Sequence, residues 1–287
     1  MTNASAATPP TPTARRAAVL GAPIRHSLSP VLHRAAYAEL GLDDWTYGAY
    51  EIDEAALAGF VGSLDASWAG LSLTMPLKRA ILPLLDKIGT VARDVDAVNT
   101  VVFTADGRRV GDNTDVPGLV AALRERGVDR VESAAVLGAG ATATSALAAV
   151  REVTEGPVSV YVRGDARARE MRAAGERLGV AVHVRPWADA AEALRAPLVV
   201  STTPKGACDH LALDLPAGES VGVLFDVVYD PWPTTLAGAW ERAGGVVVSG
   251  LDLLVHQAVL QVALMTGRPG PLAAMRAAGE AALAHRA

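Results

Sequence analysis

Short apolar runs alternate with longer amphipathic segments along almost the whole chain. The runs predict buried strands, and the segments between them repeat apolar positions with helical spacing. This alternation is typical of α/β folds, in which helices cover a largely parallel sheet. The first part of the chain predicts strands at Ala17–Gly21, Tyr47–Glu51, Ala69–Leu73, Asn99–Phe103 and Val110–Asp112, the last two as a hairpin, and helices at Pro30–Leu40, Glu54–Leu64 and Lys78–Leu85.

After a linking helix at about Gly118–Gly127, a second block has the period of a doubly wound parallel sheet of Rossmann type. Beyond Gly250 only two helices are predicted, and these cannot form a core alone. We expect them to pack back on the first block and to span the cleft between the two. The predicted elements are strands Ala134–Leu137, Val158–Val162, Val180–Val184, Leu198–Ser201, Gly222–Val227 and Gly245–Val248, and helices Ala141–Val150, Arg167–Leu178, Thr235–Ala243, Asp252–Thr266 and Pro271–His285.

The pattern predicts two domains, the first of them discontinuous in sequence. Residues 1–15, rich in Thr, Ala and Pro, predict a disordered tail. Residues 16–117 together with 252–287 form the predicted α/β substrate-binding catalytic domain. Residues 118–251 form the predicted Rossmann domain.

Composition narrows the classes of protein. The chain has 287 residues, of which 51% are hydrophobic, and its formal charge is −5, whereas a nucleic-acid-binding protein is expected to carry a basic stripe. Cys208 is the single cysteine, so no internal disulfide can form, which fits a reducing cytosol. No uninterrupted apolar run is long enough to span a membrane. We therefore expect a cytoplasmic enzyme with a small-molecule substrate and no metal, either a monomer or a homodimer.

Lys78 and Asp115 each end a tight motif. Lys78 closes Ser72-Leu-Thr-Met-Pro-Leu-Lys78, where an apolar strand turns into a helix, and Asp115 closes Gly111-Asp-Asn-Thr-Asp115 after another strand. A lysine and a carboxylate at two strand ends suit proton transfer to a small oxygenated substrate. They are the predicted catalytic pair.

A glycine turn provides a place for a dinucleotide. Gly138-x-Gly140-x-x-Ala143 follows a hydrophobic strand and opens an Ala-rich helix, so that backbone N–H groups at the helix N-terminus would face a pyrophosphate. At the end of the next strand stands Arg163, followed by Arg167 and Arg169, where NAD enzymes usually have Asp or Glu. Guanidinium groups suit a 2′-phosphate, which favours NADP over NAD. An exposed Arg-rich helix is the alternative, and Asp165 in the same loop weakens the case for NADP.

Several polar residues are candidates for substrate binding. Ser27 and Ser29 flank Leu28 and would point the same way in an extended loop, so both hydroxyls could bind one carboxylate; helix capping by Ser29 is an equal alternative on spacing alone. Asn99 and Thr100 at a strand start could line a cleft or belong to a turn. Gln257, on the apolar helix after Gly250, could face a substrate or hydrogen-bond within a core.

In this order the motifs resemble the shikimate dehydrogenase family. The resemblance runs from about Ala17 to the last helix. It rests on six segments: Gly21-Ala-Pro-Ile-Arg-His-Ser-Leu-Ser-Pro30, Thr74-Met-Pro-Leu-Lys78, Ala97-Val-Asn-Thr100, Gly111-Asp-Asn-Thr-Asp115, the glycine turn and Gly250-Leu-Asp-Leu-Leu-Val-His-Gln257. It implies NADPH-dependent, reversible reduction of 3-dehydroshikimate to shikimate in aromatic amino acid biosynthesis.

The resemblance also implies residue roles. Ser27 and Ser29 would hold the substrate carboxylate with help from Tyr229, and Thr74, Asn99, Asp115 and Gln257 would bind the ring hydroxyls. Lys78 and Asp115 would be catalytic. The residues implied for cofactor binding are Gly138, Ala139, Gly140, Ala141, Thr142, Arg163, Arg167, Thr203 and Gly250.

Three features depart from the family pattern, of which Ala141, in place of a common third glycine of the turn, is a mild one. Ser72 stands where many members have Asn, and Val162-Arg163-Gly164 replaces a frequent Asn-Arg-Thr. The altered loop leaves room for a quinate/shikimate or aminoshikimate-pathway dehydrogenase that uses NAD. A non-catalytic module that binds NADP or shikimate is the alternative of another class, against which Lys78 and Asp115 argue.

Overall fold

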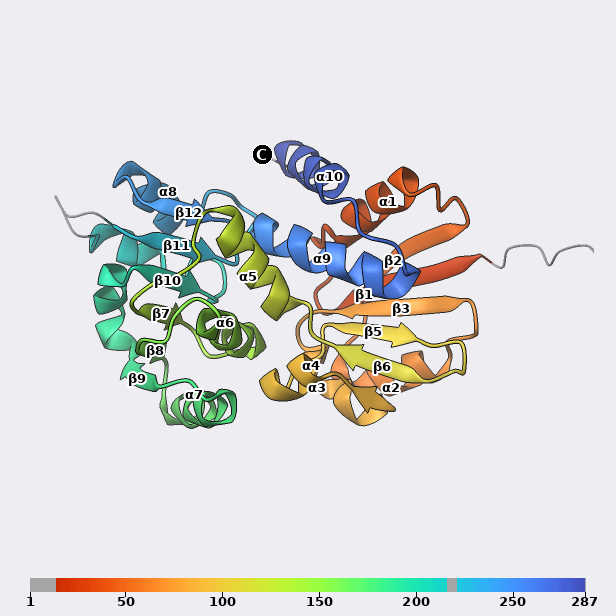
Figure 1. The fold of residues 1–287 in the computed structure, drawn as a ribbon, viewed down its shortest axis with the longest axis horizontal. Coiled ribbons are helices and arrows are strands. Elements are labelled where there is room, and N and C mark those ends of the chain that lie inside the picture. The colour runs from red at the N-terminus through yellow and green to blue at the C-terminus, as the bar shows by residue number, and fades with distance from the viewer. Residues whose placement is uncertain (1–13, 216–220, 287) are drawn as a thin grey trace, which may run out of the picture.

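Two six-stranded sheets, each covered by helices, form the two lobes of the molecule (Figure 1). The computed structural model describes residues 14–215 and 221–286. Most of the tail predicted at 1–15 lies outside the described residues, and the first strand already begins at Arg15. The strands of the first sheet are β1 (Arg15–Gly21), β2 (Trp45–Glu51), β3 (Trp68–Leu73), β4 (Lys87–Ile88), β5 (Thr100–Phe103) and β6 (Arg109–Asp112).

The first sheet has the order β2-β1-β3-β5-β6-β4 and is mixed. Strands β1, β2 and β3 run parallel, while β5 pairs antiparallel with both β3 and β6, which confirms the predicted hairpin. One face packs on the helices between residues 54 and 95, and the other packs on the first helix together with the C-terminal helices. The helices of this lobe are α1 (Ser29–Glu39), α2 (Glu54–Gly62), α3 (Leu77–Ala80) and α4 (Thr90–Val95).

The second sheet is wholly parallel, with the order β12-β11-β10-β7-β8-β9. Numbered within its own lobe this is 6-5-4-1-2-3, the Rossmann order, so the predicted fold class is confirmed. The strands are β7 (Ala134–Leu137), β8 (Val158–Val162), β9 (Val182–Pro186), β10 (Leu198–Ser201), β11 (Val223–Asp226) and β12 (Val246–Val248), and the helices are α5 (Asp115–Glu125), α6 (Ala141–Arg151), α7 (Asp165–Leu178) and α8 (Thr235–Arg242).

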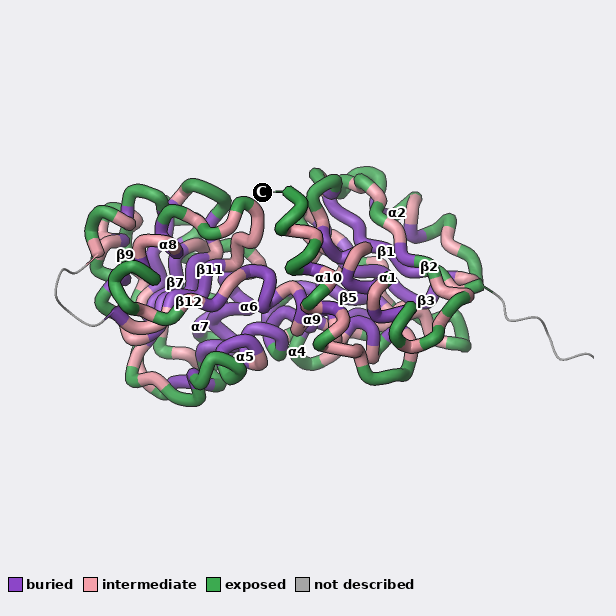
Figure 2. Tube along the Cα trace, turned by 90° about the horizontal axis from the view of Figure 1, so that it is seen from above, coloured by how far each residue is buried: buried purple, intermediate pink, exposed green. Residues whose placement is uncertain are grey.

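The last two helices, α9 (Gly250–Thr266) and α10 (Leu272–Ala284), pack back on the first sheet as expected. Helix α9 starts beside the second sheet, where the Gly250 N–H donates to the Val228 carbonyl at 3.3 Å, and it reaches Met265 against the backbone of Gly70. Together α5 and α9 fill the space between the lobes, and Figure 2 shows both as largely buried. The predicted domain boundary between residues 117 and 118 falls inside α5, which spans Asp115–Glu125.

Several local expectations were wrong. The helix predicted at Lys78–Leu85 is split into α3 and a 3₁₀ turn at Leu82–Leu84, because Pro83 has no N–H to continue an α-helix. Strand β4, helix α4 and the 3₁₀ segments Trp187–Arg195 and Asp209–Leu213 were not predicted. No helix within the described ranges is long and apolar enough to cross a membrane.

Candidate active site

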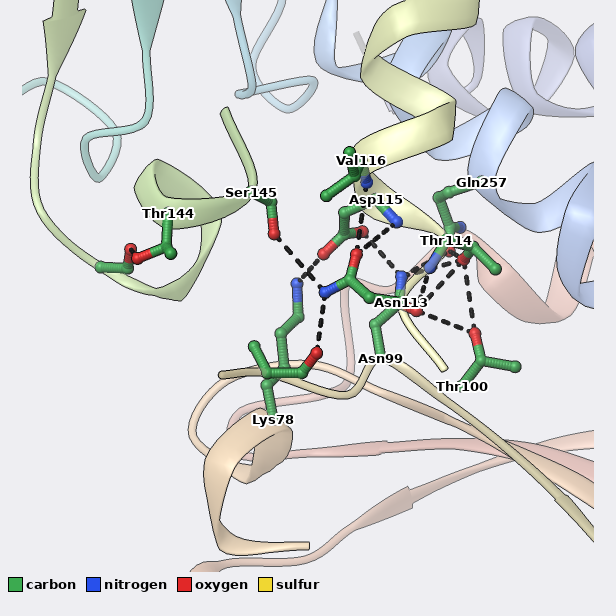
Figure 3. Close-up of polar contacts among 12 residues, drawn as sticks. Lys78, Asn99, Thr100, Asn113, Thr114, Asp115, Val116, Thr144, Ser145 and Gln257 are labelled. Atoms are coloured by element: carbon green, nitrogen blue, oxygen red, sulfur yellow. Dashed lines mark hydrogen bonds and ion pairs between the residues drawn. The ribbon is translucent and has the colours of Figure 1, made fainter. Parts of the chain in front are cut away.

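Lys78 and Asp115 meet at the junction of the two lobes, as the motifs predicted (Figure 3). Lys78 lies on α3, directly after β3, and Asp115 is the first residue of α5. The Lys78 Nζ donates to Asp115 Oδ2 at 2.6 Å, and the side chains are only 14% and 8% exposed. A charge-assisted hydrogen bond with so little water access holds the amine in one direction.

Two asparagine side chains hold Asp115 in place, one through its carboxylate and one through its backbone. Asn99 Nδ2 donates to Asp115 Oδ1 at 2.8 Å. Asn113 Oδ1 accepts from the backbone N–H groups of Asp115 and Val116 at 2.9 and 3.2 Å, which fixes the start of α5. The position at the helix N-terminus also favours a negative charge. The carboxylate thus has one oxygen fixed by Asn99 and the other turned to Lys78.

A cavity of about 260 Å³ opens beside this pair. It brings together residues from the start, middle and end of the chain, and all predicted substrate-binding residues are in its lining. Its polar lining residues are His26, Ser27, Ser29, Ser72, Thr74, Lys78, Asn99, Asp115, Tyr229, Gln257 and Gln261.

Ser27 approaches the cavity from the loop before α1, and Ser29 approaches it from the first residue of that helix. Neither acts as the cap that was the alternative interpretation: α1 begins at Ser29, and no side chain caps it. Ser27 Oγ instead accepts the backbone N–H of Ser29 at 3.3 Å, which holds the loop in shape. Tyr229 reaches this loop from the second lobe, where its hydroxyl donates to the His26 carbonyl at 3.5 Å, and burial raises its pKa.

The floor of the cavity contains a hydrogen-bond network that the motifs did not reveal. The Tyr47 hydroxyl donates to Ser72 Oγ at 2.6 Å, and Ser72 donates to Gln261 Oε1 at 2.7 Å. Gln261 Nε2 donates in turn to Thr100 Oγ1 at 3.0 Å. The sequence contained one signal that could have placed Gln261 near this site. Gln261 follows Gln257 by four residues and therefore lies on the same face of α9.

A larger cavity of about 720 Å³ lies over the carboxyl ends of β7, β8 and β10. This is the point where the order of the parallel sheet reverses, at which Rossmann folds bind nucleotides. The predicted cofactor residues that line it are Gly138, Ala139, Gly140, Ala141, Thr142, Arg163, Arg167 and Thr203.

The glycine turn fits a dinucleotide phosphate. Gly138 has φ +115°, and a Cβ there would lie 2.5 Å from Thr202 Oγ1, so the turn itself requires glycine. Gly140 is different, because an added Cβ would meet no protein atom within 4 Å. Nothing in the protein's own packing requires a glycine at this position. The open side faces the N-terminus of α6, where free N–H groups attract an anion.

Gly250 is the one predicted cofactor residue that does not line the larger cavity. It lines the smaller one, at the start of α9. A Cβ on Gly250 would collide with the carbonyl of Val227, so close packing of α9 on the loop after β11 already explains the glycine.

The two cavities share lining residues. Thr74 and Lys78 lie in both linings, so the lysine lies between the small polar cavity and the cavity that contains the glycine turn. Two adjoining cavities with a shared wall can hold two ligands in the orientation that a reaction between them needs.

Family models and relatives match most of the chain. Residues 19–101 match the shikimate dehydrogenase substrate binding domain, and residues 250–278 match the shikimate 5′-dehydrogenase C-terminal domain. A shikimate dehydrogenase (NADP(+)) of Oleidesulfovibrio alaskensis is 36% identical over 268 residues, which cover 90% of this chain and 92% of that protein. The chain belongs to the shikimate dehydrogenase family.

Solved shikimate dehydrogenases share the two-lobed fold. The structure from Mycobacterium tuberculosis aligns with a TM-score of 0.83 and 41% identity, and covers 93% of this chain and 99% of that one. The structure from Thermus thermophilus in complex with NADP(H) and shikimate aligns with a TM-score of 0.82 and 34% identity, over 94% of this chain and 100% of that one.

Proposed function

We propose that this protein is an NADP-dependent oxidoreductase that reversibly reduces 3-dehydroshikimate to shikimate in aromatic amino acid biosynthesis. The observation that carries the proposal is the position of Lys78 in the lining of both cavities, with its amine 2.6 Å from Asp115. The names of the family's NADP-dependent members support the same activity.

In this proposal the smaller cavity holds the ring acid. Ser27 and Ser29 donate hydroxyl hydrogen bonds to its carboxylate, and Tyr229 closes on the same end. The ring hydroxyls bind to Thr74, Asn99 and Gln257. These roles are supported by the fact that all three residues line the same cavity. A site built from such donors and acceptors rejects analogues that lack a hydroxyl, because its buried polar groups are then left unpaired.

Lys78 is the proposed proton donor. When bound, NADPH supplies the hydride that adds to the substrate's carbonyl carbon. As that bond forms, the Lys78 ammonium gives a proton to the carbonyl oxygen, which becomes the hydroxyl of shikimate, and solvent later restores the proton. Asp115 keeps the amine directed at this oxygen and accepts from the neighbouring hydroxyl. General acid–base help of this kind contributes about 10²- to 10⁴-fold.

NADP is the proposed cofactor, with its pyrophosphate at the Gly138–Thr142 turn and its 2′-phosphate near Arg163. Arg163 is exposed in the cavity lining, whereas Arg167, also in that lining, has its Nη1 2.7 Å from Glu170. We therefore assign the larger share of phosphate recognition to Arg163, since a guanidinium without a competing carboxylate is the better anion donor.

The domain division and the surroundings of the protein complete the proposal. We propose a catalytic domain of residues 16–117 and 252–287 and a nucleotide domain of residues 118–251, supported by the membership of β1–β6 and β7–β12 in separate sheets. The single thiol, Cys208, is free and buried. We propose that the protein acts in the cytoplasm as a monomer or homodimer, without a nucleic-acid partner.

Initial-rate assays with Lys78→Ala test the proposal. Formation of reduced cofactor is measured with shikimate or quinate and with NADP or NAD. The wild type is expected to prefer shikimate with NADP, and Lys78→Ala is expected to lose about 10²- to 10⁴-fold in kcat while shikimate affinity changes little. Lys87→Ala, which removes an exposed lysine from β4, is the matched control and should leave the rates unchanged.

Each other outcome changes the assignment. Near-normal turnover by Lys78→Ala would remove this lysine from proton transfer. A preference for quinate with NAD would place the chain among quinate/shikimate dehydrogenases. No turnover with any pair would favour an aminoshikimate substrate or a non-catalytic binding protein.

A further inference from the structure

Arg163 and the tryptophan at position 187 stack on one wall of the larger cavity. The guanidinium carbon of Arg163 lies 4.9 Å from the centroid of the Trp187 ring. Both residues line the cavity that also contains the glycine turn. This contact links two segments that no sequence motif connects.

The stack follows from the register of two parallel strands. Strands β8 and β9 pair so that Val162 stands opposite Pro186, and Arg163 and Trp187 are the next residue on each. Neighbouring strands lie about 4.8 Å apart, so the two side chains leave the sheet edge side by side.

The two partners differ in how firmly they are held. Trp187 is half-buried and packs against the apolar cluster on one face of the second sheet, which includes Leu194 and Leu211. Arg163 is exposed, and the residue after it is Gly164 with φ +86°, where the chain turns into α7. A free arginine loses much rotamer freedom when it binds a phosphate. An indole anchored in the core reduces that loss, because the guanidinium is already stacked.

We propose that Trp187 is a specificity-determining positioning residue, which holds the Arg163 guanidinium over the cavity and so raises selectivity for a 2′-phosphorylated adenine nucleotide over its unphosphorylated counterpart. This inference rests on the proposed use of NADP. In this proposal Trp187 keeps the Arg163 side chain in one orientation. The neighbouring residues Val162 and Gly164 have no polar side chain that could bind the phosphate.

The test measures binding of two nucleotide fragments by calorimetry, without turnover. Adenosine 2′,5′-bisphosphate carries the phosphate that distinguishes NADP, and AMP lacks it. Trp187→Leu keeps an apolar side chain against the core and removes the aromatic face. We expect it to weaken the bisphosphate by about 3- to 30-fold, which is the range of a cation–π contact, and to leave AMP unchanged. Trp187→Phe should restore part of the loss.

A double-mutant cycle separates this role from a general structural one. In an Arg163→Ala background, Trp187→Leu should have almost no further effect on the bisphosphate. Arg169→Ala removes an equal charge from the exposed face of α7, outside the cavity lining, and is the matched control for the electrostatic field. It should retain the wild-type ratio of the two affinities.

The outcomes are distinguishable from failure of the proposed function. If the wild type binds AMP as tightly as the bisphosphate, the use of NADP itself is wrong. If the wild type discriminates and Trp187→Leu keeps the same ratio, only the role of Trp187 is refuted. Equal loss for both fragments would make Trp187 a packing residue. If Trp187→Leu does not fold, Trp187→Phe is measured instead, both alone and in the Arg163→Ala background. If Trp187→Phe weakens bisphosphate binding equally in both backgrounds, the role of Trp187 is also refuted.

Discussion

Replacing His33 with phenylalanine tests how the buried network under the smaller cavity depends on pH. His33 lies on α1 with no exposed surface, and its ring stacks on Tyr47 with centroids 3.9 Å apart and planes 15° apart. Its Nε2 faces Gln261 Oε1 at 3.3 Å. Burial lowers the pKa of His33 to about 3, although the hydrogen bond that its ring donates to Gln261 Oε1 acts in the opposite direction. The folded protein therefore holds this histidine neutral.

The sign and size of the effect follow from linkage. An unfolded histidine has a pKa of about 6.5, so between that value and 3 the unfolded chain binds one more proton than the folded one. The free energy of unfolding is highest above pH 6.5 and falls as the pH decreases toward 3. Integration from pH 7 to pH 5 gives a loss of about 1.9 kcal/mol from this one group.

Urea unfolding of the wild type and of His33→Phe at pH 7, 6 and 5 measures the contribution of His33 to the pH dependence of the free energy of unfolding. At pH 7 the variant should be less stable by about 1 kcal/mol, because Gln261 loses one hydrogen-bond partner. By pH 5 the wild type should have lost about 1.9 kcal/mol more than the variant, which has no group to titrate here. His183→Gln, at an exposed position on β9, is the control and should follow the wild type. A constant difference between wild type and His33→Phe across this range would refute a neutral, buried His33.

Three further substitutions test the glycine turn and the junction of α9 with α10. Gly138→Ala introduces a Cβ at φ +115° against Thr202, so it should lower the free energy of unfolding by about 1–3 kcal/mol and weaken NADP binding. Gly140→Ala has room for its Cβ, so it should leave stability unchanged and weaken only NADP binding, measured by calorimetry beside thermal unfolding. Arg276→Ala removes a guanidinium 2.5 Å from Asp252, a carboxylate that is only 4% exposed, and should cost about 1–3 kcal/mol in urea unfolding.

The glycine pair serves as its own control, since the two variants add the same methyl group two residues apart. Equal stability of both would show that the φ of Gly138 imposes no strain. For Arg276→Ala the control is Arg242→Ala, at an exposed position on α8. If both arginine variants unfold at the same urea concentration, the junction of α9 and α10 does not depend on the ion pair.

The strands of the second sheet could be predicted closely from the sequence. Strands β7, β8 and β10 have the predicted bounds, because a strand buried on both faces is a continuous apolar run that ends at polar or glycine residues. Strand β4 could not be found this way, since Lys87–Ile88 is too short to show any period. Helix α5 begins three residues before its predicted start, because Asn113 Oδ1 accepts from its first backbone N–H groups.

Local periodicity and dense polar motifs were enough to predict the α/β class, the glycine turn, and Lys78 and Asp115 as the candidate pair, because these patterns are properties of neighbouring residues. Tertiary structure alone decided which distant residues meet. Gln261 joins His33 across 228 positions, and Trp187 reaches Arg163 through the register of two strands. Single residues of this kind carry no local pattern. Their partners exist only after sheet order and helix packing have brought the segments together.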